Sequence, residues 1–207
     1  MRTLKLFAAV FLIALVVLSA IAMLARIPYP NDDYFALFTL GADQKTENYF
    51  PGDVVDILPG IRIHWFIGVY NHMGSVQLVK LKFKLLNLTM EGPDQLTKTP
   101  SKRPSFYEKT RLVLSNETWT LPLVWSINNA TRSQNASAIY SILFNNEILS
   151  DNVEARALYG HNFRVVIELW VYRETTKNFS FVWSANGEQR CTWNQVWFNM
   201  TRTSLLS

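Results

Sequence analysis

The pattern of apolar and polar positions divides the chain into two parts of different character. The first part contains a run from Leu6 to Ala25, twenty consecutive uncharged residues in which Ser19 is the only polar side chain. At about 1.5 Å of rise per helical residue, this run is roughly 30 Å long, which matches the hydrocarbon core of a bilayer. A surface helix of a globular domain has a polar face, and this run has none, which makes a plain helix of a domain the weaker explanation. The pattern therefore predicts one transmembrane helix, a signal anchor, over residues 6–25.

The charges around this run predict its orientation. Arg2 and Lys5 precede it, and Arg26 follows it, with two aspartates a few residues later. An excess of positive charge before a span places that side in the cytoplasm. Residues 1–5 are therefore expected to be cytoplasmic, in a single-pass protein of the cell membrane with an extracytoplasmic C-terminal domain. A signal peptide cleaved after Ala20-Ile21-Ala22 is the alternative, and it also exports the rest of the chain.

Beyond the apolar run, the pattern changes to that of β-strands. Residues 26–33 contain two prolines, which exclude a helix and predict a stiff stalk. From there on, apolar side chains recur at every second position. In the clearest case, residues 79–85, the apolar positions alternate with Lys80, Lys82 and Lys84. A period of two indicates a strand with one dry face and one wet face.

Strand signals of this kind recur along the rest of the chain. They cover residues 34–40, 61–70, 79–85, 106–114, 118–125, 138–144, 147–149, 163–172, 179–185 and 188–198. Asn145-Asn146 and Asn186-Gly187 separate pairs of these strands, and the second dipeptide is best suited to a two-residue type I′ turn. Strands divided by turns about every ten residues, without a helical stripe, predict an all-β fold. We expect an immunoglobulin-like antiparallel β-sandwich over residues 34–207.

Six sequons for N-glycosylation support the prediction of export. They begin at Asn87, Asn116, Asn129, Asn135, Asn178 and Asn199. Asn87 and Asn199 stand at the ends of predicted strands, and the other four stand in predicted connections, where glycans would not collide with a core. A set of turns and strands rich in Asn and Thr is the alternative explanation. The sequence thus predicts an N-glycosylated extracytoplasmic domain.

Cysteine usage and charge restrict the expected partners. Cys191 is the only cysteine, so the chain has no intrachain disulfide and the exported domain must depend on its core. The net charge is +4 at pH 7, and no basic run is longer than Lys102-Arg103. Nucleic acid is therefore not an expected partner. The expected partners are the membrane, other membrane or envelope subunits, and N-linked glycans.

No catalytic residue, cofactor site or metal ligand is predicted. The sequence lacks the G-x-S-x-G, P-loop and H-E-x-x-H motifs, and its three histidines are dispersed. A blue-copper site needs two histidines and a cysteine, usually with a histidine after the cysteine, but none follows Cys191. Glu168 is unusual in a strand that otherwise looks like core. A cross-strand partner such as Lys82 explains it more simply than a carboxylate pair for glycoside cleavage does.

Tryptophans and lysines supply a candidate interaction surface. The residues concerned are Trp183, Trp193, Trp197, Lys80, Lys82 and Lys84. The tryptophans either fill a core between two sheets or form an exposed strip that stacks on sugar rings or docks a partner domain. The lysines either form a solvated strand face that discourages edge pairing or bind an acidic polymer. The sequence leaves these alternatives open.

Three short segments share a pattern with a known group of proteins. Phe38-Thr39-Leu40-Gly41, followed by Tyr49 and Pro51, is similar to an F-Y-x-L-G … Y-P motif. Residues 66–72 are similar to a V-G-I-V-N-H-E segment, and Leu169-Trp170-Val171 is similar to an L-W-V strand. These motifs resemble those of an archaeal membrane-anchored family with an extracytoplasmic domain of unknown function. Members usually carry several spans before this domain, and the resemblance implies no catalytic residues.

Taken together, these observations favour a non-catalytic function. We expect a membrane-anchored extracytoplasmic interaction or structural protein, an N-glycosylated subunit of a cell-surface or membrane complex. The alternative is a carbohydrate-binding surface module that uses its tryptophan-rich strands.

Overall fold

The computed structural model describes residues 12–19, 23 and 33–201. The chain divides into two units, Met1–Asp32 and Asp33–Ser207, which are described separately. In the first unit, residues 12–19 and 23 are α-helical and exposed. The remainder of the predicted span, residues 1–5 and nearly all of the predicted stalk lie outside the described residues. Within the described ranges, no helix is both long enough and apolar enough to cross a membrane.

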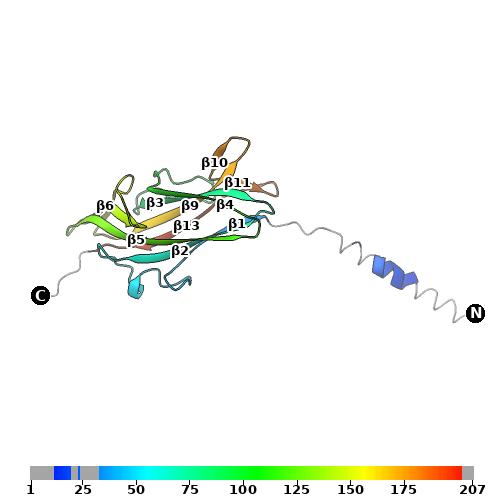
Figure 1. The fold of residues 1–207 in the computed structure, drawn as a ribbon, viewed down its shortest axis with the longest axis horizontal. Helices are drawn as coiled ribbons and strands as arrows, with labels where there is room; N and C mark the ends of the chain where they lie inside the picture. Colours follow the sequence, from blue (N-terminus) through cyan, green and yellow to red (C-terminus); the bar gives the residue numbers. More distant parts are fainter. Residues whose placement is uncertain (1–11, 20–22, 24–32, 202–207) are drawn as a thin grey trace, which may run out of the picture. The chain divides into compact units, whose positions relative to one another are not determined.

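The second unit is a β-sandwich of two antiparallel sheets, as the alternating pattern predicts (Figure 1). The first sheet has the strand order β1 (Tyr34–Leu40), β2 (Ile63–His72), β5 (Thr118–Arg132), β6 (Ala136–Phe144) and β7 (Glu147–Leu149), and β8 (Ala155–Leu158) also pairs with β6. The second sheet has the order β10 (Asn178–Ser180), β9 (Phe163–Arg173), β3 (Gln77–Leu86) and β4 (Tyr107–Val113), and β13 (Thr192–Phe198) also pairs with β9. A short hairpin of β11 (Trp183–Ala185) and β12 (Glu188–Arg190) and a 3₁₀ turn at Pro51–Asp53 complete the elements.

The core lies between the two sheets and is built from alternate residues of their strands. Along β3, for example, Val79, Leu81, Phe83 and Leu85 are at most 1% exposed. Aromatic rings join the layers: the ring centroids of Phe83 and Phe144 are 5.4 Å apart, and those of Trp125 and Phe198 are 5.7 Å apart. Edge-to-face contacts at such distances add to the stabilisation that comes from burial of apolar area. Burial of one face of each strand is what the period of two in the sequence requires.

Both predicted hairpin turns are present. Asn145 and Asn146 connect β6 to β7, and Asn186 and Gly187 connect β11 to β12. All four residues have positive φ, between 48° and 80°. Two consecutive left-handed residues are characteristic of the type I′ turn, whose twist suits antiparallel strands.

Several strand boundaries differ from the prediction. Strand β5 continues to Arg132, because its polar second half pairs with β6 through a bulge near Asn129. The predicted strand over residues 179–185 is two strands, since β10 extends the β9 hairpin whereas β11 pairs only with β12. The strand over residues 188–198 is likewise interrupted at Cys191. Strand β8, which pairs with the start of β6, was not predicted.

Candidate functional site

The lysine row and a tryptophan from the C-terminal strands meet on the outer face of the second sheet, the face away from the core. Lys80, Lys82 and Lys84 alternate along β3 with the core residues. In the pairing register, Lys82 lies opposite Glu168 of β9, and Glu168 lies opposite Trp193 of β13. The sheet therefore unites residues from three strands that are far apart in the sequence.

The other two candidate tryptophans lie in different environments. Trp197 is on the same outer face, where the guanidinium of Arg164 lies 4.7 Å from its ring centroid. Trp183 is only 4% exposed and packs edge-on against Phe35, with ring centroids 5.2 Å apart. Trp193 and Trp197 thus belong to the candidate surface, whereas Trp183 belongs to the core.

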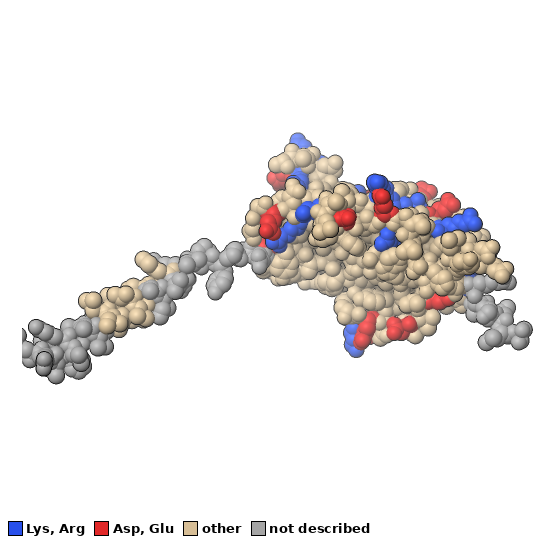
Figure 2. All heavy atoms as spheres, turned by 180° about the vertical axis from the view of Figure 1, so that it is seen from behind, with Lys and Arg blue, Asp and Glu red and all other residues tan. Residues whose placement is uncertain are grey.

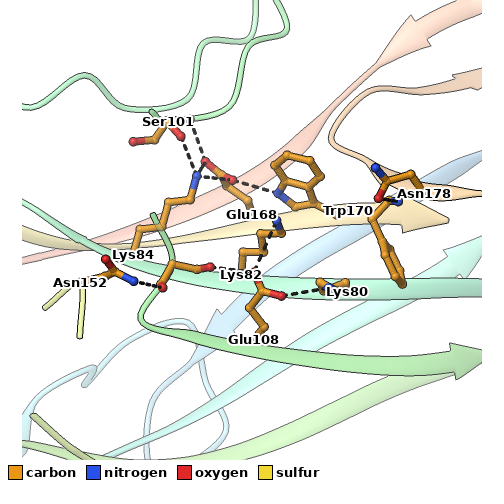
Figure 3. A network of polar contacts seen from close by, with 11 residues as sticks. Lys80, Lys82, Lys84, Ser101, Glu108, Asn152, Glu168, Trp170 and Asn178 are labelled. Atoms are coloured by element: carbon orange, nitrogen blue, oxygen red, sulfur yellow. Dashed lines mark hydrogen bonds and ion pairs between the residues drawn. The ribbon is translucent and has the colours of Figure 1, made fainter. Parts of the chain in front are cut away.

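The lysine row is not uniform. The side chain of Lys84 is 4% exposed and ion-pairs with the fully buried Glu168 (Figure 3). The ammonium Nζ lies 2.8 Å from Oε2 and 2.9 Å from Oε1 of Glu168, and it donates a hydrogen bond to the carbonyl oxygen of Ser101 at 2.7 Å. The Ser101 amide donates to Oε1 at 2.8 Å, and the indole N–H of Trp170 donates to Oε2 at 2.9 Å. Every polar atom of the buried pair therefore has a partner, as burial of charge requires.

The partner of Glu168 is thus Lys84, and the expectation that Lys82 fills this role is wrong. Lys82 is opposite Glu168 in the register, but its Nζ lies 3.4 Å from Oε1 of Glu108 on the other neighbouring strand. The physical reason is the covering of the sheet. Lys84 is covered and lies away from water together with Glu168, whereas Lys82 is partly exposed. The buried carboxylate of Glu168 therefore pairs with the ammonium that is buried beside it.

The seal is the connection between β3 and β4, residues 87–106. Ser101 is buried where the connection crosses Glu168. The connection is held to the sheet at Met90, whose carbonyl oxygen accepts a hydrogen bond from Arg164 at 2.8 Å. It is also held by Arg103, which donates to the carbonyl oxygen of Asn152 at 3.1 Å. Burial under this connection lowers the pKa of Lys84, and the hydrogen bond and charge of Glu168 oppose that shift.

The open part of the row is an ordered group, which we call the lysine–aromatic ladder: Lys80, Lys82, Glu108, Trp170 and Phe179. Nζ of Lys80 lies 2.9 Å from Oε2 of Glu108, so one carboxylate holds both lysines. Nζ of Lys80 is also 4.6 Å from the ring centroid of Phe179, and Nζ of Lys82 is 4.0 Å from that of Trp170. These are cation–π distances. The lysine side chains are 22% exposed, so the ladder is partly open to a partner.

Glu108 is ionised over a wide pH range. Desolvation favours its neutral form, but hydrogen bonds from Lys80 and Ser105 and the charges of both lysines outweigh it and lower the pKa of Glu108 to about 2. Sequence reasoning did not identify Glu108, because its role depends on the pairing of β4 with β3. On the face drawn in Figure 2, acidic and basic side chains are interspersed, and neither sign forms a continuous field over the described part.

The sequon asparagines lie at two ends of the sandwich. Asn116 and Asn178 are exposed near the end at which β1 begins, and Asn135 is exposed in the turn at the opposite end. Asn87 and Asn199 are half-buried at that opposite end: Asn87 donates to the carbonyl oxygen of Arg156 at 2.6 Å, and Asn199 accepts from the amide of Asn162 at 2.9 Å. Asn129 is exposed but lies inside β5, and Asn178 is the first residue of β10, so the predicted place of both in connections is wrong. The strand continues past Asn129 because residues 130–132 remain paired with β6 beyond the bulge.

Residues considered as metal ligands are not gathered in one place. Among residues 33–201, no three His, Cys, Asp or Glu side chains are grouped so as to hold a metal ion. Cys191 is buried and donates its thiol hydrogen to Oε1 of Gln95 at 3.3 Å. Burial raises the pKa of this thiol, which disfavours the reactive thiolate.

Comparison with known proteins adds distant structural likenesses only. Neither a family model nor a curated protein sequence matches the chain. A FixG-related protein from Vibrio parahaemolyticus is similar over 81% of this chain and 97% of its own, at 10% identity and a TM-score of 0.32. A β-glucosidase from Listeria innocua, solved with gluconolactone, is similar over 82% of this chain at 8% identity and a TM-score of 0.30, and the match spans 16% of the enzyme chain. Likenesses at this level say nothing about what the present chain does.

Proposed function

We propose that this chain is a non-catalytic, membrane-anchored extracytoplasmic interaction protein, an N-glycosylated subunit of a cell-surface or membrane complex. The apolar run over residues 6–25 supports the anchor, and the positive charge before it supports a cytoplasmic N-terminus. The six sequons, of which four begin at exposed asparagines, support glycosylation of the exported domain.

The proposed domain type is immunoglobulin-like. Strands β1, β2 and β5 are neighbours in one sheet, and β4, β3, β9 and β13 are neighbours in the other. The chain changes sheet between β2 and β3, returns between β4 and β5, and changes again before β9. Such Greek-key crossings between antiparallel sheets are usual in immunoglobulin-like sandwiches, which often serve as binding modules at cell surfaces.

The observation that carries the proposed interaction is the ordered ladder beside half-exposed tryptophans on one sheet face. Trp170, Trp193 and Trp197 are all partly exposed there. Aromatic residues dominate the binding energy of many interfaces, and they contribute most when their rotamers are already fixed. Glu108 and the two lysines of the ladder restrain Trp170 and Phe179 in this way. We therefore place the partner-binding surface on the outer face of β4, β3, β9 and β13.

The test is site-specific photo-crosslinking of the full chain in its native membranes. A photoreactive residue replaces Thr110, which lies opposite Lys80 in the register, and in a matched control it replaces Thr120 on the outer face of the other sheet. We expect a discrete adduct from position 110 that disappears in a Trp170→Ala background, and none from position 120. Equal labelling from both positions, or an adduct indifferent to Trp170, would contradict the proposed surface.

The carbohydrate-binding alternative rests on the same partly exposed tryptophans. Trp183 is buried and cannot stack on a sugar, which leaves Trp170, Trp193 and Trp197. Quenching of the tryptophan fluorescence of the purified chain by iodide, measured with and without soluble polysaccharide, distinguishes the two functions. Protection of the tryptophans by polysaccharide favours the carbohydrate module, whereas unchanged quenching favours a protein partner.

A further inference from the structure

The end of the sandwich at which β1 begins exposes an apolar group from three strand ends. We call this group the tether-end patch: Tyr34, Val76, Leu112 and Leu114, whose side chains are between 37% and 55% exposed. Leu112 lies opposite Leu78, another partly exposed apolar residue, in the pairing of β4 with β3. Apolar residues scattered singly are normal on a surface, but four exposed ones at a single end of a domain offer apolar area to a contact.

A buried asparagine fixes the geometry of this end. Asn71 is fully buried, and its Nδ2 donates to the carbonyl oxygens of Ser75 at 2.9 Å, Val113 at 3.0 Å and Leu114 at 3.1 Å. Its backbone carbonyl also accepts a hydrogen bond from the amide of Asn116 at 2.7 Å. One side chain thus ties the β2–β3 turn to the β4–β5 turn. The backbone segments that carry Val76 and Leu114 are therefore fixed relative to one another.

Amphipathic rings complete the patch. Tyr34 packs against Tyr70 and His72, with ring centroids 5.9 Å and 5.0 Å away. Nδ1 of His72 lies 2.8 Å from the side-chain oxygen of Asn116. Tyrosine rings with one apolar side and one polar tip are enriched at the boundary between lipid and water. The guanidinium Nη2 of the nearby Arg111 lies 2.9 Å from Oε1 of Glu117. This ion pair therefore adds no net charge beside the patch.

The length of chain before Tyr34 limits where this end can be. Between the predicted span and Tyr34 lie only the eight residues 26–33. At 3.3–3.6 Å per extended residue, they reach at most about 29 Å. A tether this short keeps the patch at a high effective concentration near the bilayer surface, so that even a weak contact is populated.

We propose that the tether-end patch inserts into the headgroup region of the bilayer that holds the anchor. This inference rests on the membrane anchor of the proposed function. Contact through Tyr34, Val76, Leu112 and Leu114 removes apolar surface from water, and it leaves the opposite end, with Asn87, Asn135 and Asn199, pointing away from the membrane. It also requires that Asn116 and Asn178, the two sequon asparagines at this end, stay unmodified, because a glycan on either would separate the patch from lipid.

The experiment uses the full chain reconstituted in phosphatidylcholine vesicles, in a Cys191→Ala background. A fluorophore is attached at Leu114→Cys or, as a second reporter, at Val76→Cys, and quenching by brominated phosphatidylcholine is measured. The matched control is Leu158→Cys in β8, a leucine that is 73% exposed at the opposite end. We expect at least a threefold stronger quenching at positions 114 and 76 than at 158.

Extraction at alkaline pH separates the two possible failures. Equal quenching at all positions in a chain that resists extraction overturns the tether-end contact and leaves the anchor intact. A chain that is extracted overturns the anchor and this inference with it. Glycan mass at Asn116 or Asn178 in the native protein also overturns the contact, without affecting the anchor.

Discussion

Glu168 and Glu108 both form ion pairs with lysines of β3 on the outer face of the second sheet, but Glu168 is buried and Glu108 is partly exposed. Glu168 and Lys84 lie under the connection of residues 87–106, and the carboxylate is fully shielded from water. Glu108, 37% exposed, holds Lys80 and Lys82 on the open part of the face. The lysines occupy equivalent alternate positions of β3, so the strand itself does not distinguish them. The difference shows that the covering segment decides which charge is structural and which is available to a partner.

The largest expected effect comes from removing one member of the buried pair. Glu168→Ala leaves the Lys84 ammonium buried without its counter-ion, which costs about 3–5 kcal/mol of the free energy of unfolding. Lys84→Met/Glu168→Leu removes both charges, and it is expected to recover most of that loss. Denaturant unfolding of the full chain in detergent, followed by tryptophan fluorescence, measures both. A single variant as stable as the wild type would mean that water reaches Glu168.

A smaller effect is expected from the indole hydrogen bond. Trp170→Phe keeps an aromatic ring beneath Lys82 but removes the N–H that donates to Oε2 of Glu168. The loss of a hydrogen bond to a buried charge costs about 1.5–3 kcal/mol. The same unfolding measurement tests it, with Trp197→Phe as the matched control, since that ring contacts the guanidinium of Arg164 and not Glu168. Equal effects of the two substitutions would contradict a specific role for the indole nitrogen.

The open ladder is expected to contribute less to stability. Glu108→Gln weakens two partly exposed ion pairs, each worth about 0.2–1 kcal/mol. Salt sharpens the contrast, because exposed charges are screened and buried charges are not. We expect 1 M NaCl to abolish most of the difference between Glu108→Gln and the wild type, and to leave the effect of Glu168→Ala unchanged. Insensitivity of both to salt would show that the ladder is as shielded as the buried pair.

The stability that Glu108 contributes is also expected to depend on pH. The folded-state pKa of Glu108 is about 2 and its unperturbed value is 4.5, so the unfolded chain binds more protons at this site between those values. The stability contributed by Glu108 is therefore complete above about pH 4.5, and it is lost as the pH falls towards 2. Unfolding measured across this range in the wild type and in Glu108→Gln isolates the contribution. Parallel pH profiles would show that Glu108 gains no stabilisation from the lysines.

The sequence predicted the local features of the fold well. The alternation at residues 79–85 indicated β3 and its core face, and Asn186-Gly187 indicated the type I′ turn between β11 and β12. Both signals are local, because side-chain alternation and backbone φ depend on a few consecutive residues. Strand β8 has no comparable signal: it is short, and its pairing with the start of β6 comes from tertiary contact.

By itself, therefore, the sequence determined the apolar run, the all-β pattern, the turns and the sequons, since each follows from neighbouring residues. Only the tertiary structure decided that Lys84 is buried while Lys80 and Lys82 are not, and that Trp183 is core while Trp193 and Trp197 are surface. These outcomes depend on the register between β3, β4 and β9 and on the path of residues 87–106. The energy of a charged or aromatic side chain is set by what lies over it, and that neighbour is distant along the chain.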